Sequence, residues 1–507
     1  MIQGWRTLAL AGGLTLSAGC AGTRPQPHLS ARSADREAVR FVPAVIARTR
    51  DGATSPPPAT QLPSRDGVKT VGFENNQPTV APEEPVESPV LDAPENSATN
   101  GSPQPVSLGT LEAWALEHNP SIRQASASAM KSMGFRNQVS QLPNPTIGYM
   151  GQQLGDDGTD QHMAFLSQDI VLGGKLALND QVLGHGVQSQ LWEVEAQRFR
   201  VLTDVRLRYY DALAAQQRLG AANEFHKVLV KGVSVAEARK QALEGTQPEV
   251  LLARVQLNQL ELTQRRSEIA FNAAWNELAA TIGLRHLPVA PLEITAGPPT
   301  SDRDWNVVYE DLIARSPEIR AANSRVCRAA ANVQRQEVQP IPNLELQLAV
   351  GHDQGTDAQF GQVQAGLPIP VFNKNRGNID AAQAEYCRAL QEVERLKMSI
   401  RARLARAAQD FDAALAMVEQ YEQKIIPQAK ESQDLSEQAY AAGEFGFLEV
   451  LTSRRVYFEA TLELINARRD LAQAAATIDG LLLTGGLDQT VDTPDDDGLR
   501  GQALSGQ

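Results

Sequence analysis

Residues 141–149, QLPNPTIGY, end a helix-like run with two prolines and continue as an extended segment. About two hundred residues later, residues 339–347 read QPIPNLELQ and do nearly the same. Proline inside a helix removes a backbone hydrogen bond and clashes with the preceding turn. Both stretches therefore predict the end of a helix and the start of a strand.

Other segments recur at a similar offset. NPSIR at residues 119–123 returns as SPEIR at 316–320, and EVLL at 249–252 returns as EVLT at 449–452. A period this long is too large for a solenoid and indicates a duplicated domain with pseudo-twofold internal symmetry.

Each half is expected to contain a helix, two strands, one very long helix and a returning helix. Residues 175–244 hold no proline and would span on the order of 100 Å as a helix. The strands are predicted at residues 145–155 and 162–172 in the first half, and at 343–351 and 359–371 in the second.

The predicted strands have the properties of membrane strands. Residues 344–350 alternate apolar and polar side chains, which is the period of a half-buried strand. About ten residues also suffice for a tilted strand to cross a bilayer. Four strands cannot close a barrel, and open edges in lipid are costly. The chain is therefore expected to oligomerise, either as a dimer with eight strands or as a trimer with twelve strands and room for a pore.

Composition and charge limit the possible functions. The chain is 42% hydrophobic, and its net charge of −13 argues against a nucleic-acid partner, which needs a basic face. Residues 21–105 hold 14 of the 29 prolines among polar residues, which predicts a disordered tether.

The N-terminus has the form of a secretory signal. Arg6 precedes an apolar run at residues 7–16, and small residues lead to Cys20. The segment resembles a bacterial lipoprotein signal, in which Cys20 becomes lipidated. An ordinary signal peptide with an incidental cysteine is the alternative.

No arrangement of residues indicates catalysis or a cofactor. Asp156, Asp157, Asp160 and His162 could ligate a metal in type, but their spacing fits no calcium loop and no histidine follows at i+4. A solvated loop is the preferred interpretation. We expect no enzyme activity, no cofactor and no bound metal.

Residues 107–483 resemble the outer-membrane efflux protein (TolC) family in the order of these features. Residues 367–379, LPIPVFNKNRGNI, look like its heavy-metal-efflux subgroup, and residues 440–460, YAAGEFGFLEVLTSRRVYFEA, are similar to its tip signature. The resemblance implies a mainly α fold with a small β portion. A long α-helical barrel would join four strands per chain that contribute to a trimeric, 12-stranded transmembrane β-barrel.

The resemblance also implies that two helix-turn-helix tips contact a periplasmic adaptor protein. In this sequence the tips correspond to Gly245 and Thr246, and to Gly443, Glu444 and Phe445. A helix reversal needs positive φ, so we expect the glycines to supply it.

Family members often narrow the periplasmic end with acidic side chains beyond the tip. Glu449 and its repeat mate Glu249 occupy such positions, and threefold symmetry would make each a ring of like charges that favours cations. A second acidic residue found in some relatives is Thr452 here. Two interpretations remain: these glutamates form a gate, or they are solvated side chains without that role.

The implied function is the outer-membrane channel of a tripartite efflux system, a passive conduit for metal cations or small toxic molecules. The implied partners are two further copies, a periplasmic adaptor, an inner-membrane pump of the resistance-nodulation-division type, and outer-membrane lipid. A peptide or protein exporter duct is one alternative. A soluble periplasmic coiled-coil scaffold is another.

The expected domains follow from these boundaries. They are a signal peptide (1–19), a tether (20–106), a first repeat (107–283), a linker (284–304), a second repeat (305–483) and a flexible acidic tail (484–507).

Overall fold

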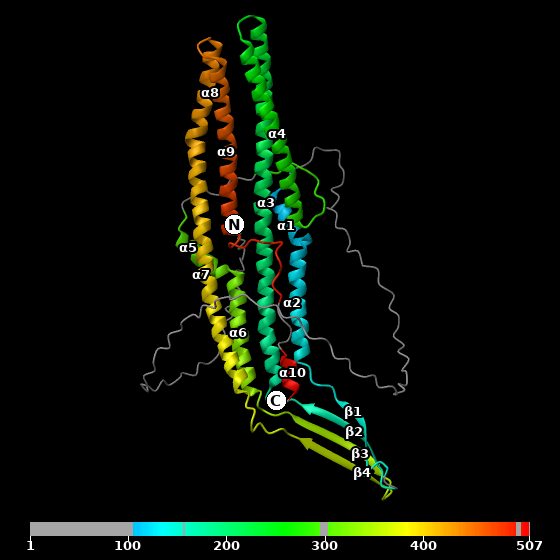
Figure 1. The fold of residues 1–507 in the computed structure, drawn as a ribbon. Coiled ribbons are helices and arrows are strands. Elements are labelled where there is room, and N and C mark those ends of the chain that lie inside the picture. The colour runs from blue at the N-terminus through cyan, green and yellow to red at the C-terminus, as the bar shows by residue number, and fades with distance from the viewer. Residues whose placement is uncertain (1–104, 156–157, 295–302, 493–497, 506–507) are drawn as a thin grey trace, which may run out of the picture. The chain divides into compact units, whose positions relative to one another are not determined.

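The computed structural model describes residues 105–155, 158–294, 303–492 and 498–505. The predicted signal peptide, Cys20 and nearly all of the tether lie outside these residues. The described part contains long helices and one four-stranded sheet (Figure 1).

The same series of elements occurs twice along the chain. The first series is α1 (Leu108–His118), α2 (Pro120–Val139), β1 (Thr146–Gln152), β2 (Gln161–Ile170), α3 (Lys175–Gln241) and α4 (Gln247–Ile282). The second series is α5 (Trp305–Arg315), α6 (Pro317–Val338), β3 (Leu344–Asp353), β4 (Ala358–Gly366), α7 (Arg376–Gln420), η1 (Tyr421–Ile425), α8 (Ile426–Ala441) and α9 (Phe447–Asp479). A short α10 (Leu499–Leu504) follows.

The repeated motifs start corresponding helices. Asn119 caps α2 by accepting a hydrogen bond from the Ser121 amide at 2.9 Å, and Ser316 caps α6 in the same way. Pro120 and Pro317 each occupy the first helical position, where a missing N–H costs nothing.

The two repeats differ in their long outgoing helix. α3 runs without interruption for 67 residues, as the absence of proline predicted. In the second repeat, a π-helical turn η1 separates α7 from α8, and Pro427 stands in the first turn of α8. A proline in a helix leaves a carbonyl without its donor, and the wider turn accommodates this.

Each repeat has its own apolar core around its helices. Leu111, Tyr209 and Trp275 belong to the first core, and Leu312 and Phe411 to the second. The linker begins as part of the first core, since Trp275 Nε1 donates to the Leu287 carbonyl at 2.9 Å.

The C-terminal residues differ from the flexible tail that was expected. The Gly486 carbonyl accepts a hydrogen bond from Gln197 at 2.7 Å, and the Val491 carbonyl accepts one from Gln190 at 2.8 Å. Buried amides on α3 therefore bind the segment that follows α9, and α10 packs at the sheet end of α3 through its buried Leu499 (Figure 1). Acidic composition alone did not reveal these partners.

Candidate functional site

The sheet joins strands from both repeats. Its order is β1-β2-β3-β4, all antiparallel, and Ile147, Leu166, Leu348 and Val363 lie opposite one another across the four strands. All four strands start within two residues of their predicted starts, but β1 and β4 end earlier than predicted. β1 and β4 are the edges.

One face of the sheet is apolar and exposed. Its register places on a single face all the large hydrophobic side chains of the strands that are exposed, by 38–83%. They are Ile147, Tyr149, Leu166, Ile170, Leu348, Val350 and Val363. Water does not favour such a continuous apolar patch, which is typical of a surface that contacts lipid or another protein.

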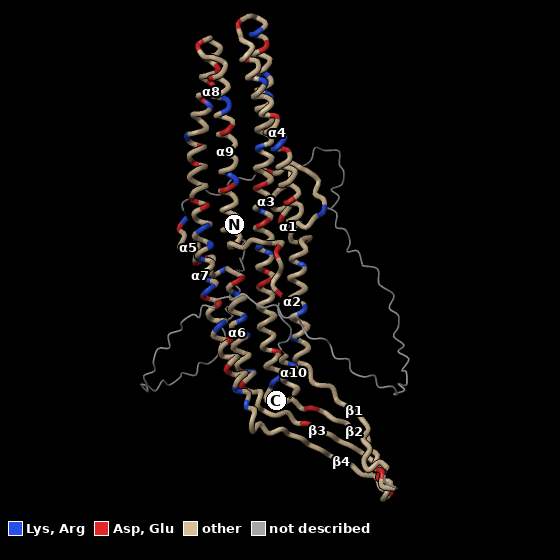
Figure 2. The backbone as a smooth tube through the Cα atoms, in the orientation of Figure 1, with Lys and Arg blue, Asp and Glu red and all other residues tan. Residues whose placement is uncertain are grey.

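The opposite face carries the strands' carboxylates. Asp169 and Glu345 are paired residues of β2 and β3, and Asp353 lies on the same face at the other end of β3. The four strands contain no lysine or arginine, and Figure 2 shows red but no blue along them. Like charges directly opposite each other in a sheet are destabilising, so this face is polar at a cost in stability.

Glycines make room for large side chains on this second face. A Cβ added to Gly351 would lie 2.5 Å from the Met163 side chain and 2.6 Å from the His162 carbonyl oxygen. A Cβ on Gly148 would lie 2.3 Å from the Phe165 ring. These positions need glycine because neighbouring strand residues occupy the space.

The turn residues considered as metal ligands have other contacts. Asp160 accepts a hydrogen bond from the Gly155 amide at 3.3 Å, and His162 is 2.5 Å from the Tyr149 hydroxyl. Asp156 and Asp157 lie outside the described residues. Across the part of the chain that the structure describes, no three His, Cys, Asp or Glu side chains could hold a metal ion.

The hairpin tips lie at the opposite end of the helices from the sheet (Figure 1). Gly443 reverses the α8–α9 turn with φ of 80°, as predicted. Gly245 does not have the positive φ expected of it; Leu243, two residues earlier, has φ of 65° and corresponds to Gly443. The assignment of Gly245 to the tip stays a prediction. Thr246 is the N-cap of α4, and Glu444 and Phe445 are exposed in the second turn.

Both candidate gate residues fold back on their own helices. Glu249 Oε2 accepts a hydrogen bond from the Thr246 amide at 3.3 Å, which completes a capping box. Glu449 Oε2 lies 2.6 Å from the position of an added Cβ on Gly446, the N-cap of α9. Glu249 therefore helps to start its helix, whereas Glu449 only lies beside the residue that precedes its own helix, and the gate stays a prediction for both.

The two tips contact each other in the described chain. The Arg239 guanidinium lies 4.8 Å from the centre of the Tyr440 ring, and its hydrogen bond to Tyr440 raises the pKa of Arg239. Phe447 and Leu451 of α9 are buried in a cluster with Leu229 and neighbouring residues of α3 and α4. These contacts hold the ends of the first and second hairpins together, a feature that sequence reasoning missed.

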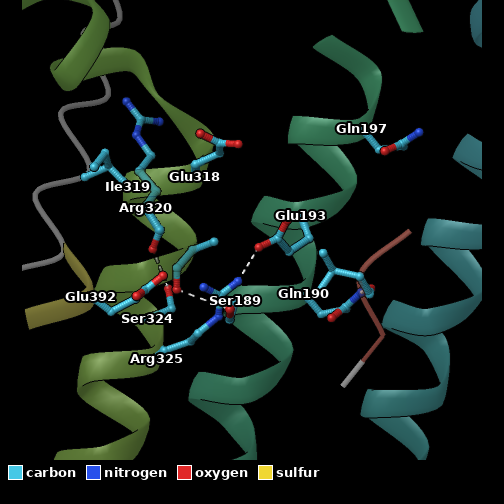
Figure 3. A network of polar contacts seen from close by, with 12 residues as sticks. Ser189, Gln190, Glu193, Gln197, Glu318, Ile319, Arg320, Ser324, Arg325 and Glu392 are labelled. Atoms are coloured by element: carbon cyan, nitrogen blue, oxygen red, sulfur yellow. Dashed lines mark hydrogen bonds and ion pairs between the residues drawn. The ribbon is translucent and has the colours of Figure 1, made fainter. Parts of the chain in front are cut away.

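Polar contacts join the helices between the tips and the sheet. Figure 3 shows the ion pair between Arg325 of α6 and the buried Glu193 of α3. Glu318 of α6 accepts from Arg200 of α3 at 3.3 Å and from Arg403 of α7 at 2.6 Å. The network fixes three helices side by side.

Comparison with known proteins is consistent with this arrangement. The family model described as "Outer membrane efflux protein" matches residues 308–482. The cobalt-zinc-cadmium resistance protein CzcC of Cupriavidus metallidurans is 22% identical over 75% of this chain and 90% of its own length. Residues 308–482 therefore match the outer membrane efflux protein family.

Solved structures support the same fold for this efflux protein. VceC of Vibrio cholerae has a TM-score of 0.61 at 20% identity, covering 74% of this chain and 96% of that one. CusC has a TM-score of 0.62 at 16% identity, covering 77% and 96%. The predicted fold class is confirmed.

The match to outer membrane efflux proteins places this protein in the outer membrane, extending into the periplasm. The homotrimer, periplasmic adaptor and inner-membrane pump expected from the resemblance agree with this match. The family consists of channel proteins. The alternative of a soluble scaffold is thereby excluded. No helix within the described ranges is long and apolar enough to cross a membrane.

Proposed function

We propose that this protein is the outer-membrane exit duct for divalent metal cations and has no catalytic activity of its own. The single observation that carries the proposal is the sheet face with Asp169, Glu345 and Asp353 and without any lysine or arginine. In a threefold channel, each of these carboxylates would contribute to a ring of like charges around the pore.

The two faces of the sheet give the strands their orientation. The apolar face, with Val350 and Val363, would contact acyl chains, and the acidic face would then line the pore. Rings of carboxylates favour cations and repel anions. The similarity to a cobalt-zinc-cadmium resistance protein agrees with a metal substrate.

A second candidate function is the export of a small organic molecule. The pyoverdine export outer membrane protein OpmQ of Pseudomonas putida is 30% identical over 53% of this chain and 58% of its own length. A peptide or protein cargo stays a further alternative.

Metal and drug tolerance separate these functions. We expect deletion of the gene to sensitise cells to divalent metals, and the intact gene to restore tolerance. A variant with Asp169→Asn, Glu345→Gln and Asp353→Asn should restore it only in part. Glu385→Gln, a change on the exposed surface of α7, is the control and should restore it fully. Unchanged metal tolerance after deletion, with new sensitivity to organic compounds, would favour the second function.

The proposed gate, tips and lipid anchor have tests of their own. Glu449→Gln should reduce cation preference in single-channel recordings if the carboxylate reaches the pore, and identical selectivity would exclude the gate. Charge reversal at Glu444 should weaken binding of the adaptor.

Mass spectrometry of the mature N-terminus should show an acylated Cys20, and an unmodified cysteine would refute lipidation.

A further inference from the structure

Two basic side chains are buried where the long helices meet the sheet. Lys175 is the first residue of α3, and Arg335 lies in the last turn of α6. Both residues are 0% exposed. Lysine and arginine are almost never fully buried unless a partner neutralises them.

The direct contacts of both cations are neutral amides. Lys175 Nζ donates to Asn343 Oδ1 at 2.9 Å, and Arg335 Nε donates to Asn179 Oδ1 at 2.5 Å. The NH₂ groups of the two asparagines donate to backbone carbonyls of α10, at 2.7 and 3.1 Å. Those bonds fix each amide with its oxygen toward the cation, so amides supply hydrogen bonds but no negative charge.

The guanidinium of Arg335 is incompletely bonded. Its Nη1 and Nη2 atoms are buried and have no hydrogen-bond partner within the described residues. Burial lowers the pKa of Arg335 to about 10, and no carboxylate opposes this effect. The pKa of Lys175 is lowered to about 8, first by burial and then by the nearby Arg335. Buried donors without acceptors are rare in folded proteins and call for an ion or water.

We propose that Arg335 and Lys175 form the site of a structural anion of halide size, held by the Nη atoms of Arg335. A halide is a single atom that accepts several N–H groups, and it carries the charge that the asparagines lack. Neither Nη atom reaches solvent, so an ion bound there would be enclosed by the folded chain.

The position of the site gives the ion a role in the fold. Asn343 immediately precedes β3, Lys175 begins α3 after β2, and both asparagines bind α10. An anion here would fasten the strand connections and the C-terminal helix to the long helices. Because the site forms only in the folded chain, unfolding would release the ion, and halide would raise stability by mass action.

Thermal unfolding of the detergent-purified, full-length protein tests this site. The midpoint is measured at constant ionic strength while chloride or bromide replaces gluconate. We expect a saturable rise with halide in the wild type and no such rise in Arg335→Met. Arg388→Met is the matched control, because Arg388 is an exposed arginine paired with Glu385, and it should keep the response.

Crystals of the wild type grown in bromide provide a second readout, which does not depend on whether a variant folds. An anomalous peak in contact with the Arg335 guanidinium is expected. Absence of that peak, or a midpoint that ignores the halide in the wild type, would overturn the proposal. So would a halide response that persists unchanged in Arg335→Met, since it would then be a general salt effect.

Discussion

Leu243 adopts a left-handed backbone conformation at the first hairpin tip, with φ of 65°. Its side chain is 94% exposed, so packing does not offset the strain. An L-residue in this region costs about 1–2 kcal/mol, whereas glycine occupies it freely. The corresponding position of the second tip is Gly443, with φ of 80°.

Leu243→Gly should therefore stabilise the first tip. Part of the relieved strain is lost to the greater freedom of glycine in the unfolded chain, so we expect a net gain of about 0.5–1 kcal/mol. Gly443→Leu should destabilise the second tip. Hydrogen exchange of the tip amides measures both effects, and a loss of protection in Leu243→Gly would contradict the assignment.

At this scale the sequence predicted where the chain reverses but not which residue takes the strained conformation. Proline pairs and glycines marked the helix ends and turns correctly. Gly245 was chosen because glycine usually supplies positive φ, yet the first tip reverses two residues earlier, at Leu243. The burial of Lys175 and Arg335 was equally invisible, because it depends on contacts among residues far apart in the chain.

Corresponding helices carry corresponding ion pairs. Arg254 of α4 contacts Glu237 of α3 at 2.6 Å, and Arg454 of α9 contacts Glu437 of α8 at 2.8 Å. Their surroundings differ, because the Arg254 side chain is 58% exposed and that of Arg454 is 17% exposed. Exposed ion pairs contribute little to stability, whereas partly buried pairs are costly to break.

Arg454→Ala should destabilise the second hairpin by about 1–2 kcal/mol, and Arg254→Ala should cost under about 0.5 kcal/mol in the first. Chemical denaturation of the two variants provides the comparison. Equal losses of unfolding free energy in the two variants would show that the exposure of the arginine does not determine how much each ion pair stabilises the fold.

The buried Glu193 predicts a pH dependence. Burial raises its pKa above the usual 4.5, against the attraction of Arg325 and Arg200 and together with the repulsion of Glu318. The folded protein thus binds a proton more readily than the unfolded chain does, so this group's contribution to stability falls as pH rises above about 4.5. Unfolding free energies measured from pH 4.5 to 7.5 should show this decline in the wild type and a flatter profile in Glu193→Gln. A profile unchanged by the substitution would contradict it.

Element order was largely predictable, since proline breaks, strand alternation and the repeat each follow from local sequence. The π-helical turn before α8 and the attachment of residues 486–492 to α3 were not predicted. The turn accommodates Pro427, but a proline alone does not specify a π-helical turn, and the attachment to α3 depends on residues far apart in the chain.

The proposed orientation of the molecule in the membrane depends on the difference between the apolar and the acidic face of the sheet. A spin label at Val363 should contact lipid, and a label at its neighbour Gln364 should face the pore. Electron paramagnetic resonance of each label is measured in a variant without Cys327 and Cys387. Oxygen should increase the relaxation rate of the label at 363 more strongly, and a water-soluble nickel complex should increase that of the label at 364. The reverse order would mean that the faces are exchanged.

Four apolar residues of α4, spaced by four, seven and seven positions, also have a role at this scale. Leu251, Val255, Leu262 and Ile269 are 49–63% exposed in the single chain. They offer an apolar surface to a neighbouring copy in the trimer, so Leu262→Lys should lower the proportion of trimer in detergent, as measured by light scattering. Glu261→Lys, at the neighbouring exposed residue that pairs with His226 of α3, is the control, and equal trimer content in both variants would exclude this surface.

The most direct measurement is the reversal potential of the purified trimer in a planar lipid bilayer under a potassium chloride gradient. Carboxylate rings on strands that contain no lysine or arginine predict a potential of the sign given by cation preference, reduced in the variant with Asp169→Asn, Glu345→Gln and Asp353→Asn. An anion-selective current, or selectivity that this variant leaves unchanged, would contradict the assignment of the acidic face to the pore.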